Sequence, residues 1–271
     1  MKQIIVIIVF VLFTKSTFSQ NIDQSKVPAV VLNAFQLIYP NANDVHWEKE
    51  DQNYQIKYKV NSKPHILKMD YKGYVFQHLQ DLYASEIPPV VLNTIQPRIT
   101  YFDIEDADKY EKDNRITYEI KFKIDGKHHY FWVNEKGKLL KYRKELKDSE
   151  VPLSIMNSIK SKYGNIDIDY SKYVEERGEI IYIVRGEIND NDHNFRFDDK
   201  GNIVKLVVNI KNSEIPDSII KTLTTSYKDY EIRDTDLIDE KGETIYILRI
   251  KKSKDQVYVT FNANGKILEV K

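Results

Sequence analysis

The stretch Ser149-Glu150-Val151-Pro152 occurs in four versions along the chain, and this repetition decides the predicted fold. The other three copies are Ser25-Lys26-Val27-Pro28, Ser85-Glu86-Ile87-Pro88 and Ser213-Glu214-Ile215-Pro216. Each copy opens a segment of about 64 residues. A fixed period of this length indicates tandem structural repeats.

The stretch itself predicts the start of a helix. A serine can accept a hydrogen bond from a free backbone N–H of the first turn. The proline three residues later lies where its missing N–H costs little. In three copies a glutamate follows the serine and places a carboxylate near the positive end of the helix dipole. Lys26 replaces it in the first copy, so we expect that helix to begin less firmly.

Two further markers repeat in the same register. A turn of the form Asp/Asn-x-x-Gly recurs every 64 residues and ends at Gly73, Gly137, Gly201 and Gly265. A tyrosine keeps the same step at Tyr54, Tyr118, Tyr182 and Tyr246. Glycine supplies the positive φ that such a hairpin turn needs. Three markers in one register predict four copies of one structural unit.

Within each copy the hydrophobic pattern changes from a period of 3.6 to a period of 2. One helical stripe consists of Ile219, Ile220, Leu223 and Tyr227. One half-buried strand carries Tyr118, Ile120, Phe122 and Ile124 on one face. In the second copy, Pro97 should end the helix early.

We therefore predict an α+β fold of four tandem units, each one helix plus a four-stranded antiparallel sheet. A unit of about 63 residues is only marginally stable alone. We expect neighbouring units to share sheet edges or cores for this reason. The predicted units span residues 20–83, 84–147, 148–211 and 212–271.

Residues 1–19 have the pattern of a signal peptide. Lys2 precedes an apolar run from Ile4 to Phe13, and Thr17-Phe18-Ser19 precedes Gln20. The run is short for a membrane span, which favours cleavage near Ser19-Gln20 over an uncleaved anchor. We expect a periplasmic or secreted protein with no membrane span in the mature chain.

Composition and motifs exclude several classes of function. The chain has no cysteine, which excludes disulfides, thiol catalysis and a bacterial lipid anchor. It has 41 basic and 41 acidic residues, so it has no global attraction to nucleic acid. Motifs of serine hydrolases, zinc proteases and phosphate-binding loops are absent from the sequence. We therefore expect no enzyme, no catalytic residues and no cofactor.

The six histidines do not predict a metal site. His65, His128/His129 and His193 occupy equivalent positions in successive repeats. Adjacent strand residues point to opposite faces, so His128 and His129 cannot hold one ion on a regular strand. We interpret these histidines as part of a solvated strand edge. The run Asn189-Asp190-Asn191-Asp192 lacks the glycine and distant glutamate of a calcium loop and is interpreted as a turn.

The sheet face away from the helices carries the candidate binding site. Tyr130 and Trp132 alternate with inward-facing residues of their strand and should stand on the outer face. We predict that they anchor a partner, with His128 and Lys121 on the rim, because aromatic side chains supply binding hot spots. The alternative is packing against a neighbouring unit. Packing is the preferred interpretation for Ile181, Ile183, Ile245 and Ile247.

The Ser-Glu-Ile/Val-Pro helix, the four strands and the Asp/Asn-x-x-Gly hairpin together resemble a known family. They are similar to the PepSY-like, beta-lactamase-inhibitor-like (BLIP-like) exported proteins of Bacteroidetes-type bacteria, over nearly all of residues 22–271. The resemblance implies helix-plus-four-strand units that pair, so that four units form two BLIP-like domains. It implies no catalytic residues, and related modules bind or inhibit other proteins.

The combined expectation is an exported, non-enzymatic, inhibitor-like binding protein. Its outer sheet face would grip an unknown envelope or extracellular protein or peptide. The alternative is an envelope protein that binds a small molecule or a metal ion in a cleft between unit pairs.

Overall fold

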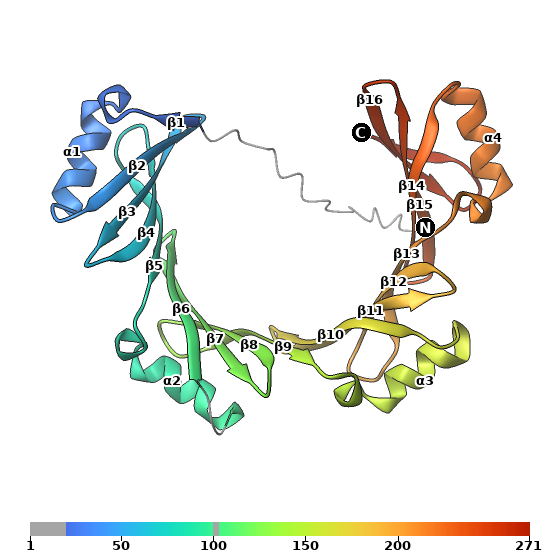
Figure 1. Ribbon diagram of the computed structural model, residues 1–271, viewed down its shortest axis with the longest axis horizontal. Helices are drawn as coiled ribbons and strands as arrows, with labels where there is room; N and C mark the ends of the chain where they lie inside the picture. The colour runs from blue at the N-terminus through green and yellow to red at the C-terminus, as the bar shows by residue number, and fades with distance from the viewer. Residues whose placement is uncertain (1–19, 100–102) are drawn as a thin grey trace, which may run out of the picture. The chain divides into compact units, whose positions relative to one another are not determined.

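The computed structural model describes residues 20–99 and 103–271 (Figure 1). The predicted signal peptide, residues 1–19, lies outside the described residues. Within them the α-helices are α1 (Ala29–Ile38), α2 (Pro89–Ile95), α3 (Leu153–Lys162) and α4 (Asp217–Ser226). Helix α2 is the shortest because Pro97 falls in the 3₁₀ turn Gln96–Arg98 that follows it.

The strands make up most of the remaining structure. They are β1 (Gln20–Ile22), β2 (Asn43–Glu50), β3 (Asn53–Val60), β4 (Lys63–Asp70), β5 (Val75–Asp81), β6 (Asp103–Lys112), β7 (Arg115–Ile124), β8 (Lys127–Asn134), β9 (Leu139–Leu146), β10 (Asp167–Glu176), β11 (Glu179–Ile188), β12 (Asn191–Phe197), β13 (Ile203–Asn209), β14 (Glu231–Glu240), β15 (Glu243–Lys252), β16 (Asp255–Asn262) and β17 (Ile267–Val270).

The fold-class prediction of four tandem units, each one helix plus a four-stranded antiparallel sheet and paired into two BLIP-like domains, is wrong. The 17 antiparallel strands of the described residues belong to one sheet, accompanied by only four α-helices. Pairings β5–β6, β9–β10 and β13–β14 continue the sheet across the second, third and fourth Ser-x-x-Pro stretches. The expected sharing of sheet edges therefore extends along the whole strand order of the described residues. The predicted unit boundaries at residues 84, 148 and 212 stay predictions.

The Ser-x-x-Pro stretch begins its helix later than predicted. Each serine lies in a short 3₁₀ turn, and α1, α3 and α4 begin only after the proline. The glutamate caps this turn: Glu150 Oε2 accepts a hydrogen bond from Lys147 N at 2.7 Å, and Glu214 Oε2 accepts one from Lys211 N at 2.8 Å. In the first copy, which lacks the glutamate, Asp23 accepts from Ser25 N instead.

The repeating hairpin glycines have two physical causes. All four have positive φ, between 77° and 84°. Each also lies against the helix of its own repeat, where a side chain would collide with helix atoms such as Ala34 Cβ at Gly73 or the Ser218 carbonyl at Gly265. Glycine recurs every 64 residues because each position requires both a positive φ in the turn and room for a close helix contact.

The described chain divides into two compact units. The N-terminal unit contains residues 20–94, 106–120 and 133–138. Its core packs α1 against β2–β4 through Val31, Phe35, Trp47, Ile56 and Leu67, all nearly or fully buried. Figure 1 shows α1 lying across these strands.

The C-terminal unit contains residues 95–99, 103–105, 121–132 and 139–271. One core joins α3 and α4 to strands β11–β16, with Ile155, Ile219, Phe195, Leu248 and Phe261 almost fully buried. The residues considered next lie on β7, β8 and β9.

Candidate partner-binding face

The four predicted site residues lie together on two strands of the C-terminal unit. Lys121 is on β7, and His128, Tyr130 and Trp132 are on β8. Phe131, between the two aromatic residues, is 0% exposed in the core. The alternation therefore places Tyr130 and Trp132 on the opposite face, where both are half-buried.

The two aromatic side chains form a stacked platform. The ring centroids of Tyr130 and Trp132 are 6.0 Å apart, with an interplanar angle of 15°. The guanidinium carbon of Arg143 lies 4.0 Å from the Tyr130 centroid and 5.6 Å from that of Trp132. Lys121 Nζ lies 5.9 Å from the Tyr130 ring. The platform thus combines aromatic faces with cations, which the ring quadrupoles attract.

Sequence reasoning missed Arg143, which is on β9 beside the platform. The signal was present, because Tyr142 of the same strand is buried and its neighbour must point to the other face. We define the platform face as Lys121, His128, Tyr130, Trp132 and Arg143.

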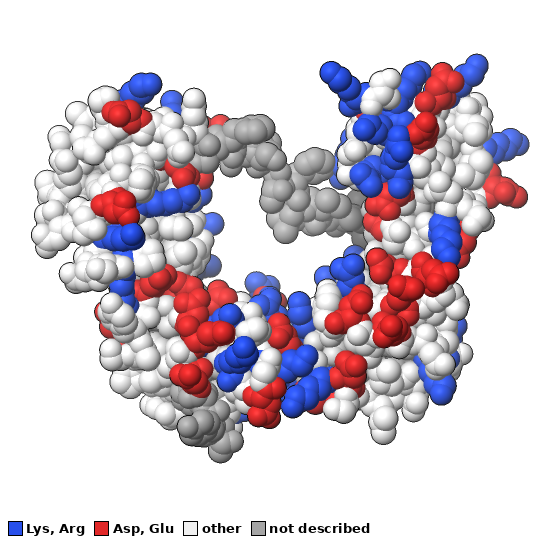
Figure 2. Space-filling view, viewed as in Figure 1, with Lys and Arg blue, Asp and Glu red and all other residues white. Residues whose placement is uncertain are grey.

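Ion pairs hold the rim of the platform face. Glu105 on β6 lies 2.9 Å from Lys121 Nζ and 3.4 Å from His128 Nε2. Glu145 on β9 lies 3.0 Å from His128 Nδ1 and also accepts a hydrogen bond from the His128 backbone N–H at 3.2 Å. The hydrogen bond from Lys121 lowers the pKa of Glu105. Figure 2 shows acidic and basic side chains intermixed over β6–β9.

Aliphatic side chains extend this face across the neighbouring strands. Arg143 pairs in register with Val174 of β10, which in turn pairs with Ile181 of β11. The isoleucines at 181, 183, 245 and 247 are all half-buried. Among the described residues, none of these isoleucines belongs to the core formed by α3 and α4.

The interpretation of the equivalent histidines as a solvated edge is wrong. His65 and His193 are each only 7% exposed. His193 Nδ1 pairs with the Asn191 carbonyl at 2.8 Å, and His129 Nδ1 pairs with Tyr142 Oη at 2.9 Å. These side chains face the helix side of the sheet, so the inward alternation of each strand buries them.

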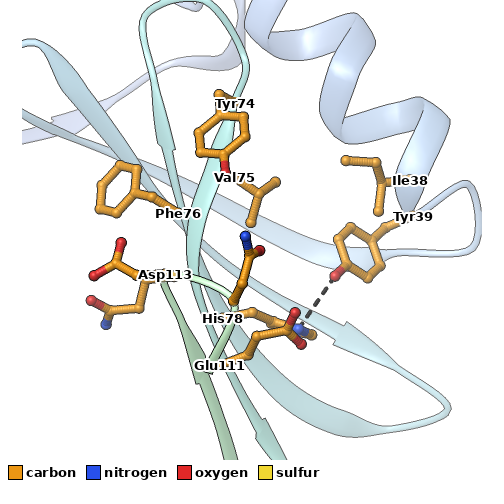
Figure 3. A pocket seen from close by; sticks show the side chains of 10 residues that line it. Ile38, Tyr39, Tyr74, Val75, Phe76, His78, Glu111 and Asp113 are labelled. Carbon is orange, nitrogen blue, oxygen red and sulfur yellow. Dashed lines mark hydrogen bonds between the residues drawn. The ribbon is translucent and has the colours of Figure 1, made fainter. Parts of the chain in front are cut away.

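In the N-terminal unit, His78 forms the centre of a partly buried polar network. Its Nε2 lies 3.0 Å from His65 Nδ1 and 3.2 Å from Tyr58 Oη, and its Nδ1 lies 3.3 Å from Tyr39 Oη. Burial lowers the pKa of His78 to about 4. Figure 3 shows Tyr39 directed at His78 beside Glu111, in a hollow of about 190 Å³.

A second hollow, of about 380 Å³, lies on the α1 side of the same unit. It is lined mainly by apolar side chains, including Leu32, Phe35 and Val45. Trp47 also lines it, is 3% exposed, and its indole N–H has no hydrogen-bond partner among the described residues.

The acidic run Asp103 to Asp108 is typical of a solvated strand by its sequence, but Asp108 is not fully solvated in the structure. Asp108 is half-buried and pairs in register with Asp81 of β5. Burial, together with the charges of Asp106 and Asp81, raises the pKa of Asp108 to about 7. Asp108 therefore holds its proton up to near neutral pH.

Residues 20–99 and 103–271 contain no group of three or more histidine and carboxylate side chains arranged to hold a metal ion. The same residues contain no helix long and apolar enough to cross a membrane.

Comparison with known proteins places the chain near several solved structures. No family model matches it, and no curated protein matches it. A DUF2874 family protein from Bacteroides ovatus is 23% identical with a TM-score of 0.36, covering 48% of this chain and 94% of its own. A BLIP-like protein from Bacteroides fragilis is 20% identical with a TM-score of 0.36, covering 46% and 93%. A protein from Bacteroides eggerthii described as periplasmic is 15% identical with a TM-score of 0.38, covering 44% and 88%.

At these identities and TM-scores the likenesses carry no argument about activity or partners. Their descriptions agree with the BLIP-like part of the resemblance, while the PepSY-like part and the repeats stay predictions. Proteins described as periplasmic recur among them, in agreement with the expected periplasmic or secreted location. The chain is similar to BLIP-like and DUF2874 periplasmic proteins of Bacteroides.

Proposed function

We propose that this is an exported, non-enzymatic binding protein that holds an envelope or extracellular protein or peptide on the platform face. The observation that carries the proposal is the stacked Tyr130–Trp132 pair with Arg143 over it, on the helix-free side of the sheet. Tyrosine, tryptophan and arginine are the residues most enriched at the energetic centres of protein interfaces. Inhibitor activity would be one form of such binding.

The form of the face supports a macromolecular partner. The platform lies on strands β7–β9, and the aliphatic side chains of Val174 and Ile181 continue it onto β10 and β11. An extended surface of this kind can contact several residues of a partner at once. Half-buried aromatic residues can bury further area when a partner covers them.

The test is capture of partners from a native envelope extract on the immobilised protein. Trp132→Ala should sharply reduce the recovery of specific partners, while the melting temperature stays nearly unchanged. Tyr258→Ala is the matched control, because Tyr258 is an aromatic residue 44% exposed on β16 of the same unit. Unfolding of Trp132→Ala would show that Trp132 is part of the core, and Tyr130→Ala then serves as the second variant. Undiminished recovery with both platform variants would refute the proposal.

A second candidate function is small-molecule binding in the 380 Å³ hollow beside α1. Its volume lies within the usual range of ligand sites of about 300–1,000 Å³. The mainly apolar residues that line it, among them Leu32, Phe35 and Trp47, favour an apolar ligand. Binding of the fluorescent probe 1-anilinonaphthalene-8-sulfonate should be lost in Ala42→Trp, which fills the hollow. Equal binding by this variant would exclude the hollow as the site.

A further inference from the structure

Arg143 of the platform face differs from the other arginines of the described residues in its combination of burial and pairing. Arg143 is half-buried, and among the described residues it forms neither a hydrogen bond nor an ion pair with a carboxylate. Arg98 and Arg249, by contrast, are paired with Glu175 and Asp234. The other arginines without an ion pair among the described residues are exposed: Arg115, Arg177 and Arg196. A partly buried charge without a counter-charge is unusual, because burial without pairing is costly.

Arg143 is held by the aromatic rings through the face of its guanidinium group. The guanidinium carbon lies 4.0 Å from the Tyr130 centroid. Such stacking occupies the flat face of the group and leaves its N–H edge able to donate. Its Nε is the only one of its nitrogens among the buried, unpartnered polar atoms of the described residues. The terminal nitrogens are thus placed to donate two parallel hydrogen bonds to an approaching group.

The surroundings of Arg143 favour an anion. Lys141 Nζ lies 5.4 Å from the Trp132 ring, and Lys121 Nζ lies 5.9 Å from the Tyr130 ring. The nearby carboxylates are already engaged: Glu105 with Lys121, Glu145 with His128, and Glu176 with Lys141 at 3.2 Å. Arg143 is therefore the cation of the platform face that is left without a carboxylate among the described residues. On the side of β10, Arg143 is followed across the sheet by Val174 and Ile181, which offer an apolar contact.

We propose that Arg143 binds a carboxylate of the partner, and that the partner segment is an acidic peptide with aliphatic residues beside its Asp or Glu. The carboxylate accepts a forked pair of hydrogen bonds from Arg143, while Tyr130 holds the guanidinium plane. The aliphatic residue packs on Val174 and Ile181. This inference rests on the proposed function and names the class of segment that the platform face recognises.

The experiment uses a displayed library of random peptides, selected on the immobilised protein. Peptides retained by the unaltered protein should be enriched in Asp and Glu over the starting library. Arg143→Gln should abolish that enrichment and weaken a retained acidic peptide about tenfold or more, since a charge-assisted forked pair is lost. Arg143→Lys keeps the charge without the fork and should give an intermediate loss. Arg196→Gln is the control, because Arg196 is an exposed arginine without an ion pair among the described residues.

The outcomes separate the two proposals. Two results would overturn the carboxylate inference and leave the platform face standing. One is peptide retention that depends on Trp132 but shows no enrichment in Asp and Glu. The other is the same enrichment with Arg143→Gln as with the unaltered protein. Retention that is unaffected by Trp132→Ala overturns the platform face, and the inference with it. If Arg143→Gln unfolds, the comparison is made with Arg143→Lys and with a Glu→Gln analogue of the retained peptide, whose tenfold weaker binding is the expected result.

Discussion

The His78 network predicts that the free energy of unfolding depends on pH. A second group in the same unit, Asp108, has the opposite pH dependence and offsets it. Burial lowers the pKa of His78 to about 4, whereas an unfolded histidine titrates near 6.5. The folded state therefore binds fewer protons than the unfolded state between these pH values. Stability is lost as pH falls through this window.

The lowered pKa of His78 sets how much the free energy of unfolding changes with pH. Between pH 7 and pH 4.5, linkage gives a loss of up to about 2.4 kcal/mol, at 1.36 kcal/mol per pKa unit. Because His78 is only half-buried, we reduce this to about 2 kcal/mol. His65, whose pKa is also lowered by burial, acts in the same direction.

Asp108 acts with the opposite sign in the same window. Burial and the neighbouring carboxylates raise its pKa to about 7, so the folded state holds a proton that the unfolded state has released. Its contribution is present at low pH and is lost as pH rises toward 7. Asp108 is about half-exposed, so we discount the effect to roughly 1–2 kcal/mol. The two groups should nearly cancel in the unaltered protein.

The assay separates them with single substitutions. The chain has two tryptophans, so a Trp132→Phe background leaves Trp47, buried in the N-terminal unit, as its sole tryptophan reporter. Urea unfolding is then followed by fluorescence from pH 7 to pH 4.5. Asp108→Asn should expose a loss of about 2 kcal/mol on acidification, and His78→Gln a gain of roughly 1–2 kcal/mol. Equal pH profiles for the two variants would refute this assignment of the titrating groups.

Two further pairs of substitutions test the fold. Gly265→Ala and Gly126→Ala both place alanine at a φ of +78°, but only at Gly265 would the new Cβ meet the Ser218 carbonyl, with nothing within 4 Å at Gly126. The Gly126 variant should cost about 1 kcal/mol for the positive φ, and the Gly265 variant at least ~1 kcal/mol more from the collision, measured by denaturant unfolding. Similar costs would show that the turn alone requires the glycine. Glu214→Gln weakens the hydrogen bond accepted from Lys211 N and should cost about 1 kcal/mol, whereas Glu243→Gln, an exposed control, should be neutral in the same assay. Equal melting temperatures for these last two variants would count against the capping role.

The local pattern of the chain was predictable because it is set by short-range physics. The hairpin glycines have the positive φ that the turn spacing requires. Alternation along β8 placed Phe131 and Val133 inside, where both are 0% exposed. It thereby placed Tyr130 and Trp132 on the opposite face.

The continuity of the sheet was not predictable in the same way. Side-chain periodicity states which face of a strand is buried, but it carries no information about which backbone covers the strand's edge. The β9–β10 and β13–β14 pairings are backbone contacts of this kind. For the same reason the sequence predicted shared edges or cores between neighbouring units, but not which strands would pair.

The errors at single residues have individual causes. The serines lie in 3₁₀ turns because the proline, whose preceding residue is restricted to extended conformations, separates the turn from the helix. His65 and His193 were assigned to solvent by their polarity, although their strand positions face the core. Arg143 was overlooked because its role depends on the register of β8 and β9.

The central claim is that the stacked pair on β8 is a binding surface. The most direct measurement is the affinity of a partner or selected peptide for the unaltered protein, Trp132→Ala and Tyr258→Ala, in samples shown to be folded by their melting temperatures. We expect Trp132→Ala to weaken binding by tenfold or more, as a hot-spot tryptophan does, and Tyr258→Ala to leave it unchanged. Equal affinities for all three folded proteins would contradict the claim.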